Sequence, residues 1–174
     1  MKESQTPPSL EAVPHSRFEV VLEILALLVF AAVFFYISHV YDNLPERIAI
    51  HFNEKGEADG WGGRSSLYFA PGFLLGIWAF LIVLARTLRP KHYNLAIDLN
   101  DSNARALYQL TRSFLRLMGL SLALIALFIV ISSIQASQVE NGEPITHYLV
   151  AVIVCILFPI VYFAFRHHQI KQST

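Results

Sequence analysis

The sequence predicts an all-α protein, a four-helix transmembrane bundle with a small extracytoplasmic lobe between helices 1 and 2. The first observation is composition, because the 174 residues are 55 % hydrophobic and only 15 % charged, against about 25 % charged residues in an ordinary soluble domain. The second is the distribution of charge. Four stretches contain no Asp, Glu, Lys or Arg, and with their flanks each approaches or exceeds the roughly 20 residues that a helix needs to cross a bilayer. These stretches are 24–40, 65–85, 117–139 and 148–165.

In order along the chain, tails and connections alternate with the four spans. The first apolar run follows a start that mixes acids with bases, and no small-residue cleavage site ends it, so we expect an uncleaved anchor rather than a signal peptide. Asp101 or Ser102 can cap a helix that continues into the third span. The predicted segments are a tail at 1–17, helices at about 18–40, 65–88, 113–134 and 147–166, an outer loop at 41–64, an inner loop at 89–112, and a final part at 135–174 with a second outer loop, the fourth helix and a tail.

Basic residues in the connections predict the orientation, because Lys and Arg are retained on the cytoplasmic side of a membrane. Of the 13 Lys and Arg residues, only Arg47, Lys55 and Arg64 lie in the two connections that follow the first and third spans. The others lie in the tails or in and beside the connection between the second and third spans. We therefore expect both termini in the cytoplasm and the 41–64 loop outside it.

Charge and cysteine content exclude several classes of function. Acidic and basic residues balance at 13 each, so no basic field favours nucleic acid as a partner. Cys155 is the single cysteine, which excludes an intrachain disulfide and a cysteine-based zinc site. The sequence has no Gly-rich phosphate loop and no His-Glu-x-x-His motif, so we expect no cofactor and no enzyme activity.

One carboxylate is expected near the cytoplasmic end of the first helix, where an unpaired charge is unfavourable. This is Glu23, and Arg116 in the third span or Arg86 at the end of the second can neutralise it. An intramembrane ion pair is the first interpretation of these residues. The alternative is a proton or ion relay, which normally uses further ionisable groups deeper in the bundle.

The outer loop has the pattern of a short strand followed by turns. Three apolar residues alternate after a proline, as in a half-buried strand: Ile48, Ile50 and Phe52. Turns are expected at 53–56 and at Asp59-Gly60, because Asn, Asp and Gly tolerate positive φ and Asn and Asp can bond nearby backbone. In this interpretation Phe52 and Trp61 supply a small core, or Trp61 reaches the membrane interface.

Three roles for this lobe remain open. A metal or hydrolytic site would use His51 and Asp59 as candidate ligands with Glu54 and Glu57 nearby, although no pair has the spacing of a zinc motif. A recognition surface for a peptide, a lipid or a cell-wall fragment would use exposed polar and aromatic side chains. A purely architectural lobe is the third role. The candidate recognition residues are His51, Asn53, Gly56, Asp59, Gly60, Trp61 and Arg64.

The same loop carries a resemblance to a known family. The segment 44–62, LPERIAIHFNEKGEADGWG, resembles the signature of a bacterial membrane domain of unknown function that forms the N-terminal part of the sporulation-delaying-toxin immunity proteins. In that family Leu-Pro-x-x-Ile precedes His-Phe-Asn-x-x-Gly and Asp-Gly-Trp-Gly, between the first two membrane helices. Ala49 and Ala58 stand where the family usually has proline. The resemblance implies that residues 18–134 form the same membrane unit.

The resemblance implies a small, non-enzymatic protein of the bacterial cytoplasmic (inner) membrane. Such a protein would recognise an extracytoplasmic peptide or envelope signal, in an immunity or stress response. Its expected partners are the lipid bilayer and either such a peptide or another membrane protein. One alternative is a transporter or channel-like subunit that uses Glu23, and another is a metal-dependent membrane hydrolase.

Overall fold

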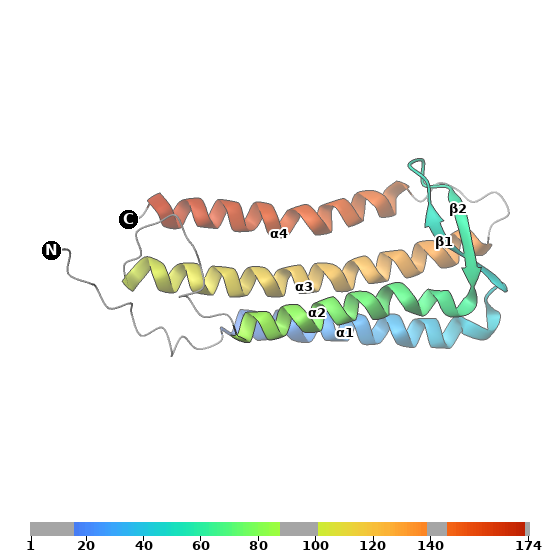
Figure 1. Cartoon of the computed structure of the whole chain (residues 1–174), viewed down its shortest axis with the longest axis horizontal. Helices are drawn as coiled ribbons and strands as arrows, with labels where there is room; N and C mark the ends of the chain where they lie inside the picture. The colour runs from blue at the N-terminus through green and yellow to red at the C-terminus, as the bar shows by residue number, and fades with distance from the viewer. Residues whose placement is uncertain (1–15, 88–100, 139–145, 173–174) are drawn as a thin grey trace.

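The computed structural model describes residues 16–87, 101–138 and 146–172. This part of the chain consists of four long helices and one small hairpin (Figure 1). The helices are α1 (Arg17–Val40), α2 (Phe69–Thr87), α3 (Asp101–Gln138) and α4 (Thr146–Gln172). The hairpin consists of β1 (Arg47–Phe52) and β2 (Ala58–Gly63), flanked by two 3₁₀ turns, η2 (Tyr41–Asn43) and η3 (Arg64–Tyr68). The fold class predicted from the sequence is confirmed.

Each of the four helices forms all or most of a segment long and apolar enough to cross a membrane, so the chain is a multi-pass membrane protein. These segments are Arg17–Asn43, Arg64–Thr87, Arg105–Gln138 and Tyr148–Gln172. The hairpin lies at one end of the bundle, called here the hairpin end (Figure 1). The start of α1 and the end of α4 lie at the opposite end, called the terminal end.

The observed helix ends differ from the predicted ones at four places, one of which is the end of α3 at Gln138 rather than near 134. η3 forms a 3₁₀ turn over residues that were expected to open the second helix. α3 begins at Asp101 rather than near 113, so part of the segment expected to be the inner loop is helical. α4 continues to Gln172, beyond the predicted end near 166. The start of α3 at Asp101 agrees with the expectation that Asp101 or Ser102 caps a helix that continues into the third span. The span itself was placed later, because charged residues interrupt the apolar sequence before residue 117.

α3 is the central helix of the bundle. In Figure 1 it lies between α4 on one side and α1 and α2 on the other. It packs along all three of these helices, whereas α1 and α2 contact each other much less. Small buried side chains beside Phe30 let α1 and α3 approach closely: Ala26, Ala123 and Ala126. Two aromatic pairs join α4 to α3: Phe114 with Phe163, and Phe128 with Tyr148.

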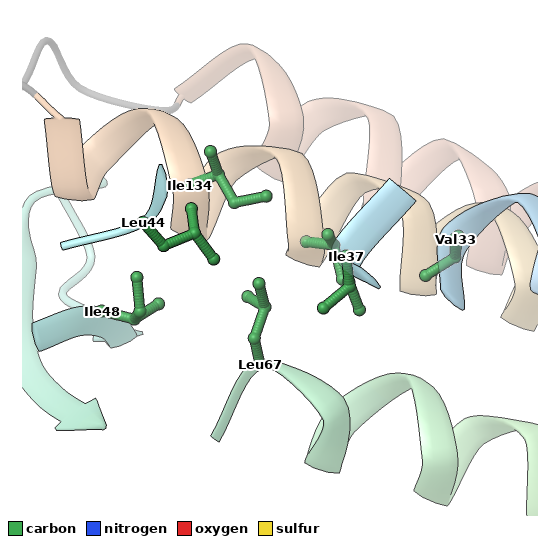
Figure 2. Close-up of a cluster of buried hydrophobic side chains, with 7 residues drawn as sticks. Val33, Ile37, Leu44, Ile48, Leu67 and Ile134 are labelled. Atoms are coloured by element: carbon green, nitrogen blue, oxygen red, sulfur yellow. The ribbon is translucent and has the colours of Figure 1, made fainter. Parts of the chain in front are cut away.

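The hairpin is packed onto the bundle by an apolar cluster (Figure 2). Ile48 of β1 and the flanking Leu44 and Leu67 meet side chains of α1 and α3 there. The buried cluster consists of Val33, Ile37, Leu44, Ile48, Leu67, Val130 and Ile134. A hydrogen bond adds to this contact, since the backbone N–H of Ala49 donates to Ser137 Oγ of α3 over 2.9 Å. The hairpin therefore has a fixed position at the end of the bundle.

Candidate functional site

The tip of the hairpin is a turn that residues 53–57 build themselves. Gly56 has a φ of 80°, a left-handed conformation that glycine adopts without strain. The side-chain oxygen of Asn53 accepts hydrogen bonds from the backbone N–H groups of Lys55 and Glu57, over 2.9 and 3.0 Å. Its amide nitrogen donates to the Glu57 carboxylate over 2.9 Å. The turn expected at 53–56 is present, and Asn53 and Gly56 act in holding it.

The prediction of a second turn at Asp59-Gly60 is wrong. Both residues lie within β2, and Gly56 is the only described residue with a positive φ. Gly60 lies directly opposite His51 of β1, and a Cβ atom at position 60 would be 2.7 Å from His51 Cβ. Glycine is required here by the close approach of the two strands and not by a turn, because real Cβ atoms do not come so close.

Two irregularities in the strand pairing decide which side chains of β1 are buried. The register shifts between Ala49 and His51, and again between His51 and Phe52. The predicted alternation therefore breaks after Ile48. Ile48 and Ala49 are both fully buried, while Ile50 is 52 % exposed. A bulge has this effect because one extra residue in a strand moves the following side chains to the other face.

The expectation that Trp61 and Phe52 form a core for the lobe is also wrong. Trp61 is 40 % exposed and Phe52 is only half-buried. The apolar contacts that hold the hairpin come instead from Leu44, Ile48 and Leu67, which pack against α1 and α3. An exposed tryptophan is therefore free to meet the membrane interface or a partner.

His51 and Asp59 meet across the hairpin. Nδ1 of His51 lies 2.5 Å from Oδ1 of Asp59, and both side chains are exposed. The contact joins β1 to β2 beside the two register shifts. In the described parts of the chain, no third His, Cys, Asp or Glu joins them in a group that could hold a metal ion. The geometry of this pair therefore gives no support to a metal site.

Arg64 lies at the base of the hairpin and not on its outer surface. Its Nε donates to the backbone oxygen of Pro45 over 3.2 Å, and the residue is half-buried. This hydrogen bond joins the chain just before β1 to the chain just after β2. Arg64 therefore holds the two ends of the hairpin together.

The structure places Glu23 between the two arginines that the sequence offered as its partners. Glu23 Oε1 accepts a hydrogen bond from Arg116 Nε over 2.7 Å, and Oε2 accepts from Arg86 Nη2 over 2.8 Å. Arg116 is buried, whereas the side chain of Arg86 is 58 % exposed. The cluster joins α1, α2 and α3 near the terminal end of the bundle.

A second, more deeply buried pair lies one turn away and was missed in the sequence. Two nitrogens of the Arg112 guanidinium donate to the two carboxylate oxygens of Glu19, and both side chains are almost fully buried. Glu19 also accepts from the backbone N–H of Ser16, at the capping box that begins α1. The spacing of these residues in the sequence could have indicated this pair, because residues four apart on a helix share one face. Glu19 and Glu23 have this spacing on α1, and Arg112 and Arg116 have it on α3.

Comparison with known proteins places the hairpin in a recognised sequence unit. Residues 26–75 match a protein family described as a domain of unknown function, DUF1648. The match runs from the middle of α1 through the whole hairpin to the beginning of α2, and includes neither carboxylate of the cluster at the terminal end. No curated protein and no solved structure matches the chain. The family description assigns no activity, and it makes no link to immunity proteins.

Proposed function

We propose that this chain is a non-enzymatic recognition protein of the bacterial cytoplasmic membrane, whose hairpin meets a peptide or another envelope signal outside the cell membrane. The single observation that carries the proposal is the construction of the hairpin. Its backbone is fixed to α1 and α3 by a buried cluster and by the Ala49–Ser137 hydrogen bond. Trp61 and Ile50 nevertheless remain exposed, and neither belongs to that cluster.

A fixed scaffold that presents exposed aromatic and apolar side chains is the usual form of a binding surface. Ordering a loop on binding costs free energy, so a surface that is already ordered binds more tightly. Trp is also one of the residues that most often supply a large share of binding energy. The exposed His51–Asp59 pair adds a polar contact beside these apolar groups.

The orientation in this proposal rests on the distribution of basic residues. The hairpin end carries Arg47, Lys55 and Arg64, while most of the 13 Lys and Arg residues belong to the other side. An immunity or stress response to a toxic peptide is the physiological form that the resemblance of the hairpin sequence favours. The transporter alternative gains no support from Glu23, because both of its oxygens bond to arginines.

The proposal predicts a loss of function without a loss of protein when the exposed hairpin residues are removed. A deletion strain of the source bacterium would be tested for survival against a panel of membrane-active peptides and against medium from sibling cultures. Wild-type chain is expected to restore survival, and Trp61→Ala and His51→Ala to lower it by about tenfold, the effect of losing one important contact. Immunoblots of membranes should show near-normal abundance for both variants.

Phe80→Ala is the control, because Phe80 is an aromatic residue on α2, away from the hairpin, and at 62 % it is even more exposed than Trp61. It is expected to protect as well as wild type. A chain in which residues 51–63 are replaced by a Gly/Ser linker of equal length should fail. Full protection by the linker variant would show that the hairpin is only a connector.

A further inference from the structure

The hairpin has two outer strand edges. The outer edge of β1 contacts the bundle, whereas the outer edge of β2, called here the free edge, pairs with no described residue. β1 packs against α3 on the side away from β2, where Ala49 donates its N–H to Ser137. The sheet has only two strands, in the order β1-β2. Within the described ranges, no backbone hydrogen bond connects the other side of β2 to the rest of the chain.

The direction of the Ala49 hydrogen bond shows which backbone groups face the free edge. In an antiparallel pair, two opposite residues either bond to each other or both direct their backbone groups outward. Ala49 lies opposite Trp61, and its N–H is directed away from β2 toward Ser137. Trp61 must therefore direct its own N–H and C=O away from β1. The pairing is regular from Ala49 back to Arg47, and Gly63 lies opposite Arg47. Because Gly63 is two residues after Trp61 on the same strand, its N–H is also directed away from β1.

The face of the strand is open at Gly63 and closed at Gly62. A Cβ atom at Gly63 would meet no heavy atom within 4 Å, whereas one at Gly62 would be 2.7 Å from Ser66 Oγ. The preceding residue is also glycine, so the backbone of β2 has no large side chain from Gly62 to Gly63. Trp61 is the one bulky residue on this part of the strand, and its side chain is partly exposed. Among the described residues, no backbone bond outside the hairpin reaches Trp61 or Gly63, so a further strand would supply partners for their outward N–H groups.

We propose that the free edge of β2 binds an extended peptide segment as a third strand of the sheet. A row of unpaired N–H and C=O groups is complementary to the backbone of another strand. No other class of ligand matches such a row as closely. The peptide would bond to Trp61 and Gly63 through its main chain and place an apolar side chain against the Trp61 ring. The inference rests on the proposed function, and it specifies how the recognised peptide is held.

Gly63→Pro tests the edge with little disturbance of the fold. Gly63 has a φ of −74°, close to the value of about −65° that proline requires, and proline removes the N–H. Its neighbour Gly62 lies in a strand, the conformation that suits a residue before proline. Gly63→Ala is the matched variant, because it keeps the N–H and adds its Cβ in open space.

The probe is a fluorescent synthetic peptide with the sequence Arg-Ile-Ala-Ile-His-Phe, a copy of residues 47–52, because this sequence forms a strand beside β2, on the edge opposite to the proposed site. Fluorescence anisotropy would measure its binding to the full chain in lipid nanodiscs. Wild type and Gly63→Ala are expected to bind it with similar Kd. Gly63→Pro is expected to raise Kd by about tenfold, the loss of one hydrogen bond. A peptide methylated on every backbone amide nitrogen should not bind, since it keeps no N–H donor on either edge and its methyl groups prevent the close approach of a second strand.

Several results would overturn the proposal. No binding of the peptide to wild type would do so, and equal binding to Gly63→Pro would show that the peptide displaces β1 instead of adding to β2. A dimer of the chain that Gly63→Pro abolishes, without peptide binding, would assign the edge to a second copy. The survival assay separates this inference from the proposed function. If Gly63→Pro protects fully while Trp61→Ala fails, recognition stands and the strand-addition proposal is wrong.

Discussion

Arg112→Met is expected to lower the free energy of unfolding by about 3 kcal/mol, because it leaves the buried Glu19 carboxylate without its main partner. Glu19 and Arg112 are almost fully buried and joined by two hydrogen bonds. This value is at the lower end of the range expected for breaking a buried ion pair, because Arg116 Nη1 still lies 3.9 Å from Glu19 Oε1. Unfolding in mixed micelles with increasing dodecyl sulfate would measure the change.

Arg86→Met is the control for this substitution, because it removes an arginine from the same cluster at an exposed position. Exposed ion pairs contribute about 0–1 kcal/mol, so its effect should be small. Glu19→Gln combined with Arg112→Met is expected to recover much of the loss, since glutamine is neutral and can still accept the Ser16 hydrogen bond. Equal losses for Arg112→Met and Arg86→Met would contradict the burial and pairing described for this cluster.

Ile48→Ala is expected to loosen the hairpin from the bundle, with a cost of about 2–5 kcal/mol for a buried isoleucine. Ile48 is fully buried among side chains of α1 and α3 at the hairpin end. Trypsin cleavage at Lys55, in the exposed tip of the hairpin, would measure the change in intact proteoliposomes. The variant should be cut faster than wild type, while the spans remain resistant.

Ile50→Ala is the matched control, because the same residue type two positions along the strand is mostly exposed. It should leave the cleavage rate near that of wild type. Similar acceleration by both variants would show that the hairpin does not depend on the Ile48 cluster. This comparison also tests the register shift between Ala49 and His51, because strict alternation would have buried both isoleucines.

The fold class could be predicted because membrane spans follow from charge-free length alone. The ends of the helices were harder to predict than their existence. Arg112 and Arg116 lie within α3, and only the carboxylates of α1, distant in the sequence, explain how a membrane helix accommodates them. Glu23 could be matched with its arginines because an isolated carboxylate in a span requires a partner. Glu19 could have been found by the same reasoning with the four-residue spacing.

The hairpin shows where local sequence preference stops being informative. Asn53 and Gly56 form the expected turn, because the turn is built from contacts between near neighbours. Asp59-Gly60 has the same local preference, yet pairing with β1 draws it into a strand. The exposure of Trp61 and the free edge of β2 depend on how the hairpin docks on α3, and no pattern within the loop encodes that docking.

The central claim is that a fixed hairpin is presented outside the cytoplasmic membrane, and site-directed thiol labelling tests it most directly. In a Cys155→Ser background, Lys55→Cys places a thiol at the exposed tip of the hairpin, and Gln169→Cys places one at the exposed terminal end of α4. Both variants would be treated with a membrane-impermeant maleimide in cells whose outer barriers are permeable to it. Labelling at position 55 and none at 169, until the cells are lysed, is the predicted result. Labelling at 169 and none at 55 would place the hairpin in the cytoplasm and contradict the account.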